Sequence, residues 1–243
     1  MSKTLSDHLY NGKFFKLLVN ETSKVVVKKG KIKFERENST LTEGEKSILK
    51  MFEYLNSLQE VLKDIEKVLF FLEIDTKKIK KVYPGLQADE EYYKYHFENY
   101  IIRIISLQDI VGKLGNILYN TNINDEKCNG YNFTDALKKL DHKNHSFVSA
   151  ILERTKHIKK VRHKKLHKGE GEIAHLKGII FWDDLQKVTN QNYDKILHQM
   201  SAEDLKAQIN SIETETIEII DLINEFFDNS LDELTKLLCV TNN

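Results

Sequence analysis

Residues 154–168, RTKHIKKVRHKKLHK, concentrate side chains that can bind phosphate and move protons. The stretch contains eight Lys or Arg and three His, and it contains no Asp or Glu. The whole chain has 37 basic and 37 acidic residues, so 37 − 8 = 29 basic residues face 37 acidic ones in the remainder. Positive charge is therefore concentrated on an otherwise acidic molecule, and this local patch favours a polyanion such as RNA as the partner.

Within this basic segment, Arg162 and His167 stand five positions apart in RHKKLH. An imidazole takes up and releases protons near neutral pH, whereas a guanidinium stays charged and fits phosphate oxygens. The pair could cleave RNA without a metal: a base removes the proton of the ribose 2′-hydroxyl, the oxygen attacks the adjacent phosphorus, and arginine stabilises the growing negative charge. DNA lacks this hydroxyl, so the chemistry selects RNA.

Spacing by itself is a weak signal, because Arg and His occur five apart by chance in many chains. Five residues of a regular helix advance about 500°, which places the two side chains about 140° apart. A shared site therefore requires a helix end, a local irregularity or two copies of the chain. Gly169 and Gly171 favour a helix that ends just after His167. A competing interpretation is that the basic run is simply a solvated helix face.

The motif and its helical context resemble the HEPN superfamily, whose helical bundles carry Arg-x4-6-His with a polar residue after the arginine. Arg162, His163 and His167 match that pattern. The resemblance implies a metal-independent ribonuclease of the toxin, anti-phage or RNA-processing kind, with Arg162 and His167 catalytic and His163 assisting. It also implies a homodimer in which two motifs face each other. We expect the RNA backbone to contact the lysines of the segment: Lys159, Lys160, Lys164, Lys165 and Lys168.

A polar stripe crosses the apolar helix expected over residues 89–119. His96, Asn99, Arg103 and Ser106 recur there at helical spacing, and burying such groups without partners is costly. One interpretation is a structural hydrogen-bond network between helices. The other is that Asn99 and Arg103 line the RNA site and help to hold phosphate.

Other kinds of site are less well supported. His163 and His167 have zinc-ligand spacing, with His157 or His175 as further candidates, but the surrounding positive charge disfavours a cation. We expect no metal and no cofactor. Trp182 fits a core position better than a base-stacking role. The sequence contains no GxGxxG, GKS, GKT, HExxH or GxSxG motif, so nothing indicates an ATPase, a dehydrogenase or a serine hydrolase.

The elements that must position these residues are helices, since the chain has one proline and only ten glycines among 243 residues. Periodic apolar residues predict helices over about 44–73 and 89–119, a short helix over 133–140, and a helix from His145 into the basic segment. Further helices are expected through Phe181 and Trp182, from Ser201 to about Phe227, and after Ser230. Thr42-Glu43-Gly44-Glu45 predicts a capping box at the start of the first long helix.

The first forty residues suggest a different element. The apolar runs 25–27 and 32–34 flank a lysine-rich stretch containing Gly30, which predicts a small β-hairpin. The expected fold is thus an all-α antiparallel helical bundle over residues 41–243, with an N-terminal appendage over residues 1–40.

Composition places the chain in the cytoplasm. Cys128 and Cys239 have neither metal-ligand nor disulfide spacing, which fits a reducing compartment. The N-terminus has no signal-peptide pattern, and no apolar run reaches the roughly 18 residues of a membrane span. We expect a soluble protein that does not enter a membrane.

Three functions remain open at this level. The leading hypothesis is an endoribonuclease that acts as a homodimer on RNA. A noncatalytic RNA-binding module of the same fold is the first alternative. The second is a protein-interaction module whose basic helix binds an acidic partner, such as an antitoxin or a regulator.

Overall fold

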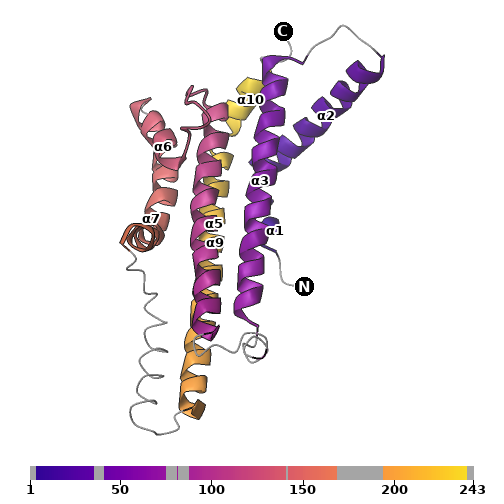
Figure 1. Cartoon of the computed structure of the whole chain (residues 1–243). Coiled ribbons are helices and arrows are strands. Elements are labelled where there is room, and N and C mark those ends of the chain that lie inside the picture. The colour runs from indigo at the N-terminus through magenta and orange to yellow at the C-terminus, as the bar shows by residue number, and fades with distance from the viewer. Residues whose placement is uncertain are drawn as a thin grey trace. The chain divides into compact units, whose positions relative to one another are not determined.

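The computed structural model describes residues 4–35, 41–74, 81, 88–140, 142–168 and 194–239. Throughout these ranges the regular structure is helical and contains no strand. This confirms the all-α prediction. The helices in Figure 1 are α1 (Leu5–Leu9), α2 (Lys13–Glu35), α3 (Glu43–Leu72), α5 (Ala88–Leu118), α6 (Gly130–Lys139), α7 (His145–Lys168), α9 (Asp194–Asp228) and α10 (Leu231–Cys239).

Most predicted helices are present. The bounds of α3 and α5 lie one residue from those expected, and α7 begins at the predicted residue, His145. Helix α9 begins before the expected Ser201, at Asp194. The predicted helix through Phe181 and Trp182 lies outside the described residues.

The chain folds into two compact units. Unit 1 comprises Met1–Lys63, Ile104–Thr155 and Ile217–Asn243, and unit 2 comprises Asp64–Arg103 and Lys156–Thr216. Because these boundaries fall inside α3, α5, α7 and α9, each of these long helices contributes one stretch to each unit.

Helix α3 begins with the predicted capping box. Thr42 N donates to Glu45 Oε2 at 2.8 Å, and Glu45 N donates to Thr42 Oγ1 at 3.2 Å, which satisfies two backbone donors that the helix start leaves free. Its buried face follows the helical period expected for an amphipathic helix. The buried side chains are Ile48, Met51, Leu55, Leu58, Leu62, Ile65, Val68 and Leu72.

The predicted β-hairpin is wrong, because residues 13–35 form the single helix α2. Phe14, Leu18, Thr22 and Val25 are buried at intervals of three and four residues, and burial of this stripe favours a helix over the strand preference of the valines. Gly30 lies inside the helix, where an added Cβ would meet nothing within 4 Å. The glycine therefore weakens the helix without turning the chain.

The N-terminal helices pack against α9 in unit 1. The rings of Phe14 and Phe15 lie 4.8 and 5.1 Å from the ring of Phe227. Phe14 N donates to Asp228 Oδ1 at 2.8 Å, and Asn224 Nδ2 donates to the carbonyl oxygen of His8 at 2.9 Å. Backbone contacts and aromatic packing together attach residues 4–25 to the same core as α9.

Helices α5 and α6 approach closely at glycines. A Cβ on Gly115 would lie 2.2 Å from the ring of Phe133, and one on Gly112 would lie 2.7 Å from the carbonyl of Asn129. Only a residue without a side chain fits at these two positions, so the glycines allow Phe133 to be buried against α5.

The buried face of α5 follows the predicted pattern, with Phe97, Ile104, Leu107 and Val111 buried, while Ile102 is exposed on the opposite side. In unit 2, α5 runs antiparallel to α3, because Asp64 contacts Arg103 whereas Phe71 contacts His96. Among the described helices, none is apolar over a length sufficient to span a bilayer.

Glu45 joins the capping box to α2. Its Oε1 accepts a hydrogen bond from Lys28 Nζ at 2.6 Å, and only 12% of its side chain is exposed. Burial disfavours the charged carboxylate, but the bonds from Lys28 and Thr42 outweigh that effect and lower the pKa of Glu45.

We expect Glu45→Gln to lower the free energy of unfolding by about 1 kcal/mol at pH 7, because the amide keeps the cap but loses the charged bond to Lys28. A carboxyl with a lowered folded-state pKa stabilises the protein above its unfolded-state pKa, and this contribution is lost as the pH falls through the folded-state value. The difference should therefore shrink in acid, as measured by urea unfolding across pH. Glu43→Gln, at a residue with an 87% exposed side chain, is the control and should change little. A pH-independent effect of Glu45→Gln would contradict this interpretation.

Candidate nucleic-acid site

Helix α7 carries the whole basic segment. It runs from His145 to Lys168, so Arg162, His163 and His167 all lie on one helix that ends at the residue before Gly169. Gly169 and Gly171, from which a helix end is predicted, lie outside the described residues. The side chains of residues 157–168 lie outside the described part of the structure, and this includes the five candidate lysines.

The first half of α7 is anchored by buried side chains in unit 1. Val148, Ile151, Leu152 and Thr155 recur at helical spacing and are all buried. Thr155 Oγ1 donates to Gln108 Oε1 on α5 at 2.7 Å, in a buried position. The buried stripe and this contact hold the first half of α7 against α5 within unit 1.

Arg154, the first cation of the basic segment, forms an ion pair with Glu218 on α9. Both side chains are about half exposed, at 49% and 45%, so the pair contributes little stability. Arg154 is therefore paired with an acid on a neighbouring helix.

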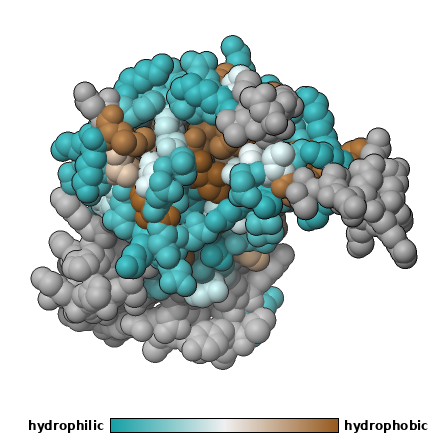
Figure 2. Space-filling model, turned by 90° about the horizontal axis from the view of Figure 1, so that it is seen from above, coloured by the Kyte–Doolittle hydropathy of each residue, from teal (hydrophilic) through white to brown (hydrophobic). Residues whose placement is uncertain are grey.

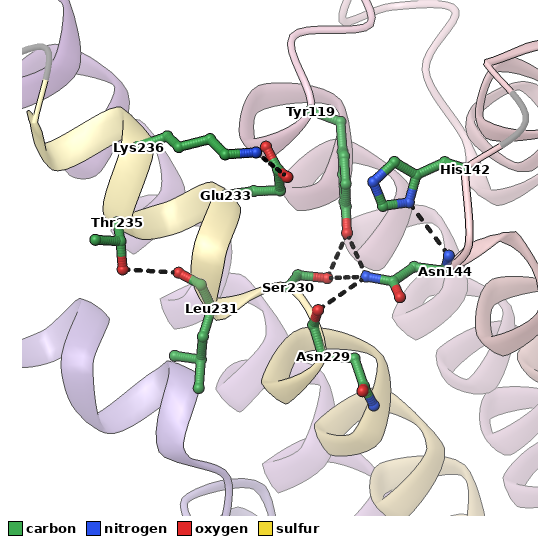
Figure 3. A network of polar contacts seen from close by, with 9 residues as sticks. All are labelled: Tyr119, His142, Asn144, Asn229, Ser230, Leu231, Glu233, Thr235 and Lys236. Carbon is green, nitrogen blue, oxygen red and sulfur yellow. Dashed lines mark hydrogen bonds and ion pairs between the residues drawn. The ribbon is translucent and has the colours of Figure 1, made fainter.

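A polar network just before α7 joins three parts of unit 1 (Figure 3). Asn144 Nδ2 lies 2.7 Å from Tyr119 Oη, 3.1 Å from Ser230 Oγ and 3.1 Å from the carbonyl oxygen of Asn229. Tyr119 follows α5, and Ser230 lies between α9 and α10. One asparagine side chain thereby ties the start of α7 to the ends of two other helices.

The directions of these hydrogen bonds are determined by the number of protons. Ser230 Oγ donates its one proton to the carbonyl oxygen of Phe226 at 2.7 Å, so Tyr119 Oη must donate across the 2.5 Å contact to Ser230 Oγ. Burial raises the pKa of Tyr119, which keeps this donor protonated. His142 Nδ1 accepts from Asn144 N at 3.2 Å, and its ring packs edge-on against Tyr119 at 4.7 Å.

Sequence reasoning missed this network. The sequence predicted a helix after Ser230, but nothing in it singled out Tyr119 or Asn144. The available signal was a polar residue directly before a helix start, which predicts a local cap but not a partner more than eighty residues away in the sequence.

The polar stripe on α5 does not form one network. Arg103 Nε pairs with Asp64 Oδ2 at 3.1 Å, and Lys67 Nζ lies 2.8 Å from Asp64 Oδ1. The bond from Lys67 outweighs burial and, with the charge of Arg103, lowers the pKa of Asp64. Asn99 Nδ2 donates to the carbonyl oxygen of Tyr95 on its own helix at 3.0 Å. The RNA-binding role of Arg103 and Asn99 stays a prediction.

His96, the first member of that stripe, is a packing residue. It is 8% exposed, and its ring stacks on Phe71 with centroids 5.0 Å apart. Burial lowers the pKa of His96, so the imidazole is neutral near pH 7.

Metal ligands are not grouped in the described part of the chain, where no set of three His, Cys, Asp or Glu side chains could hold an ion. The considered zinc set of His157, His163, His167 and His175 lies outside the described side chains. Cys128 is buried, and burial raises its pKa to about 11, so this thiol is a poor nucleophile or metal ligand at neutral pH.

Hydrophilic residues cover most of the described surface in the view of Figure 2, with hydrophobic residues in patches between them. Eight large hydrophobic side chains in the described residues are exposed: Val26, Val27, Phe70, Phe71, Tyr95, Ile102, Tyr131 and Leu140.

Comparison with family models gives one match relevant to the site. The model described as HEPN_Cthe2314, a Cthe2314-like HEPN domain, matches residues 38–235 and so includes α3 to α9 and the basic segment. Comparison with curated proteins and with solved structures gives no significant match.

We expect Asn144→Ala to lower the free energy of unfolding by about 1–3 kcal/mol, because it leaves buried oxygen atoms of Tyr119 and Asn229 without their donor. Urea unfolding monitored by circular dichroism measures the change. Asn56→Ala, at an exposed position of α3, should stay within about 0.5 kcal/mol of the wild type. Equal stability of the two variants would show that the network does not hold the start of α7.

Proposed function

Because the chain belongs to the Cthe2314-like HEPN family, we propose that it is a metal-independent endoribonuclease with Arg162 and His167 as its catalytic residues. The family indicates a nuclease or RNA-related function. The finer assignment rests on the RHKKLH motif and on its position in the second half of α7.

The observation that carries the proposal is that the basic segment belongs to a single helix fixed at its start. Fifteen residues that contain eight cations and no acid continue directly from the buried stretch of α7. Cations gathered on one helix without acids among them favour contacts with the closely spaced phosphates of an RNA strand.

The proposed roles follow from side-chain chemistry. His167 acts as the base that removes the 2′-hydroxyl proton, and Arg162 stabilises the negative charge that develops on the phosphate. His163 assists at the same site. Lys159, Lys160, Lys164, Lys165 and Lys168 hold the RNA backbone through its phosphates. Asn99 and Arg103 are proposed as further phosphate contacts, and for Arg103 such a contact would have to compete with Asp64.

Helix geometry favours a site made by two chains. Arg162 and His167 share one helix, and five residues of a regular helix turn through about 500°, so the two positions lie on different sides of its axis. We therefore propose a homodimer in which arginine of one copy and histidine of the other act on the same phosphodiester.

Cleavage of mixed RNA by the purified protein in EDTA tests the chemistry. We expect His167→Ala and Arg162→Ala each to lower the rate by about 100-fold or more, because general-base catalysis and charge stabilisation each supply at least that factor. His145→Ala is the matched control on the same helix, since its Nε2 atom contacts only Ser149 among the described residues.

Wild-type rates for His167→Ala would contradict the mechanism. RNA binding without cleavage by the wild type would instead support a noncatalytic RNA-binding module. Copurification with an acidic protein that RNase treatment does not release would support the protein-interaction alternative.

Mixing the two inactive variants tests the composite site. A heterodimer of Arg162→Ala and His167→Ala chains contains one site with both groups intact, so unfolding and refolding an equal mixture should restore about a quarter of wild-type activity. Each variant refolded alone is the control. Failure of the mixture to recover activity, while both variants remain dimeric by light scattering, would show that each site uses one chain.

A further inference from the structure

An aromatic cluster in unit 2 lies where α3 ends and α5 begins. Phe70 and Phe71 belong to α3, and Tyr92, Tyr95 and His96 belong to α5. Phe70 is 63% exposed, Tyr95 is 62% exposed and Phe71 is 38% exposed. Several large aromatic side chains exposed next to one another indicate a binding surface.

The cluster is held rigidly by a buried centre. The ring of His96 lies parallel to Phe71 at 5.0 Å and edge-on to Tyr92 at 4.5 Å and Tyr95 at 5.2 Å. Tyr92 Oη donates to the carbonyl oxygen of Phe71 at 2.7 Å, which links the two helices. Phe70 packs edge-on against Phe71, with ring centroids 5.7 Å apart. Both exposed rings, Phe70 and Tyr95, thus contact other rings of the cluster, which lowers the entropy lost when a ligand stacks on them.

Acidic residues lie close to the exposed rings in the sequence. Glu66 and Glu73 lie four residues before and three after Phe70, and Glu98 lies three after Tyr95, so all three are neighbours on the helix surface. Lys67 and Arg103 both pair with Asp64 in this unit. Exposed aromatic rings suit planar groups such as nucleobases. In the same unit, the stretch of α7 from Lys156 to Lys168 contains seven Lys or Arg and no acid.

We infer that Phe70 and Tyr95 form a stacking platform for the bases of single-stranded RNA, while the basic segment in the same unit holds the phosphates. The inference rests on the proposed RNA function and adds to it a preference for unpaired bases, since a duplex does not expose base faces. Stacking on aromatic rings accepts any base, so the platform would confer strand selectivity without sequence selectivity.

Binding is measured by fluorescence anisotropy with two short labelled strands of equal length. One is 2′-O-methyl RNA, which carries bases but cannot undergo 2′-hydroxyl attack, and the other is an abasic strand with the same number of phosphates. We expect Phe70→Ala and Tyr95→Ala each to weaken binding of the base-bearing strand by about 10-fold and to leave the abasic strand unaffected. Tyr131→Ala, at a 48% exposed aromatic residue on α6, is the control and should bind like the wild type.

Conservative variants separate stacking from general apolar contact. Phe70→Tyr keeps an aromatic face and should retain affinity, whereas Phe70→Leu keeps apolar area and should lose as much affinity as Phe70→Ala. Because the loss comes from stacking, it should persist when salt is raised, while binding of the abasic strand weakens with salt.

Several results would overturn the platform. The platform is contradicted if Phe70→Leu binds like the wild type, or if Phe70→Ala and Tyr95→Ala lose equal affinity for both strands. It is also contradicted if the wild-type protein binds both strands equally. A change in solution mass of Phe70→Ala by light scattering would identify this face as an interface between copies instead. The 2′-O-methyl strand reports binding alone, whereas the proposed catalysis is judged by cleavage of unmodified RNA, so failure of the platform and failure of the nuclease function are distinguishable.

Discussion

Buried side chains in the first three turns of α7 hold a helix whose second half carries an excess of positive charge. Thr155 is the last of them, and its hydroxyl bonds to Gln108 directly before the residues that repel one another most. Clustered cations cannot stabilise a helix by themselves, because like charges at helical spacing are unfavourable. Apolar packing and the Asn144 network must therefore supply the stability that the basic segment lacks.

The concentration of cations on α7 explains how a chain with no net charge can bind a polyanion. With 37 basic and 37 acidic residues, long-range attraction to RNA is small, and binding depends on where the cations are placed. Arg154 and Arg103 are each neutralised by an acid, Glu218 and Asp64 respectively. The second half of α7 holds the densest group of Lys and Arg in the chain, with seven of them and no acid between Lys156 and Lys168, and a phosphate backbone would be attracted there.

Local signals predicted the elements well and their partners poorly. The capping box of Thr42 and Glu45 and the apolar period of α3 are properties of neighbouring residues, so the sequence was sufficient to locate them. The hairpin was wrong because the valines of α2 favour strands locally, whereas burial of Phe14, Leu18 and Val25 on one stripe decides for a helix. Contacts such as that of Asn144 with Ser230 depend on how helices far apart in the sequence pack together, which a local sequence pattern does not predict.

The core of unit 1 extends beyond the segment that matches the family. That match begins at residue 38, yet Phe14 and Phe15 pack against Phe227 near the end of α9. Phe227 is fully buried, and without Phe14 and Phe15 it would be exposed to water. The side chains of Asn224 and Asp228 would also lose their hydrogen bonds to the N-terminal backbone. Ser230, which follows α9, belongs to the network at the start of α7, so the N-terminal helices and the start of α7 are linked through α9 within unit 1.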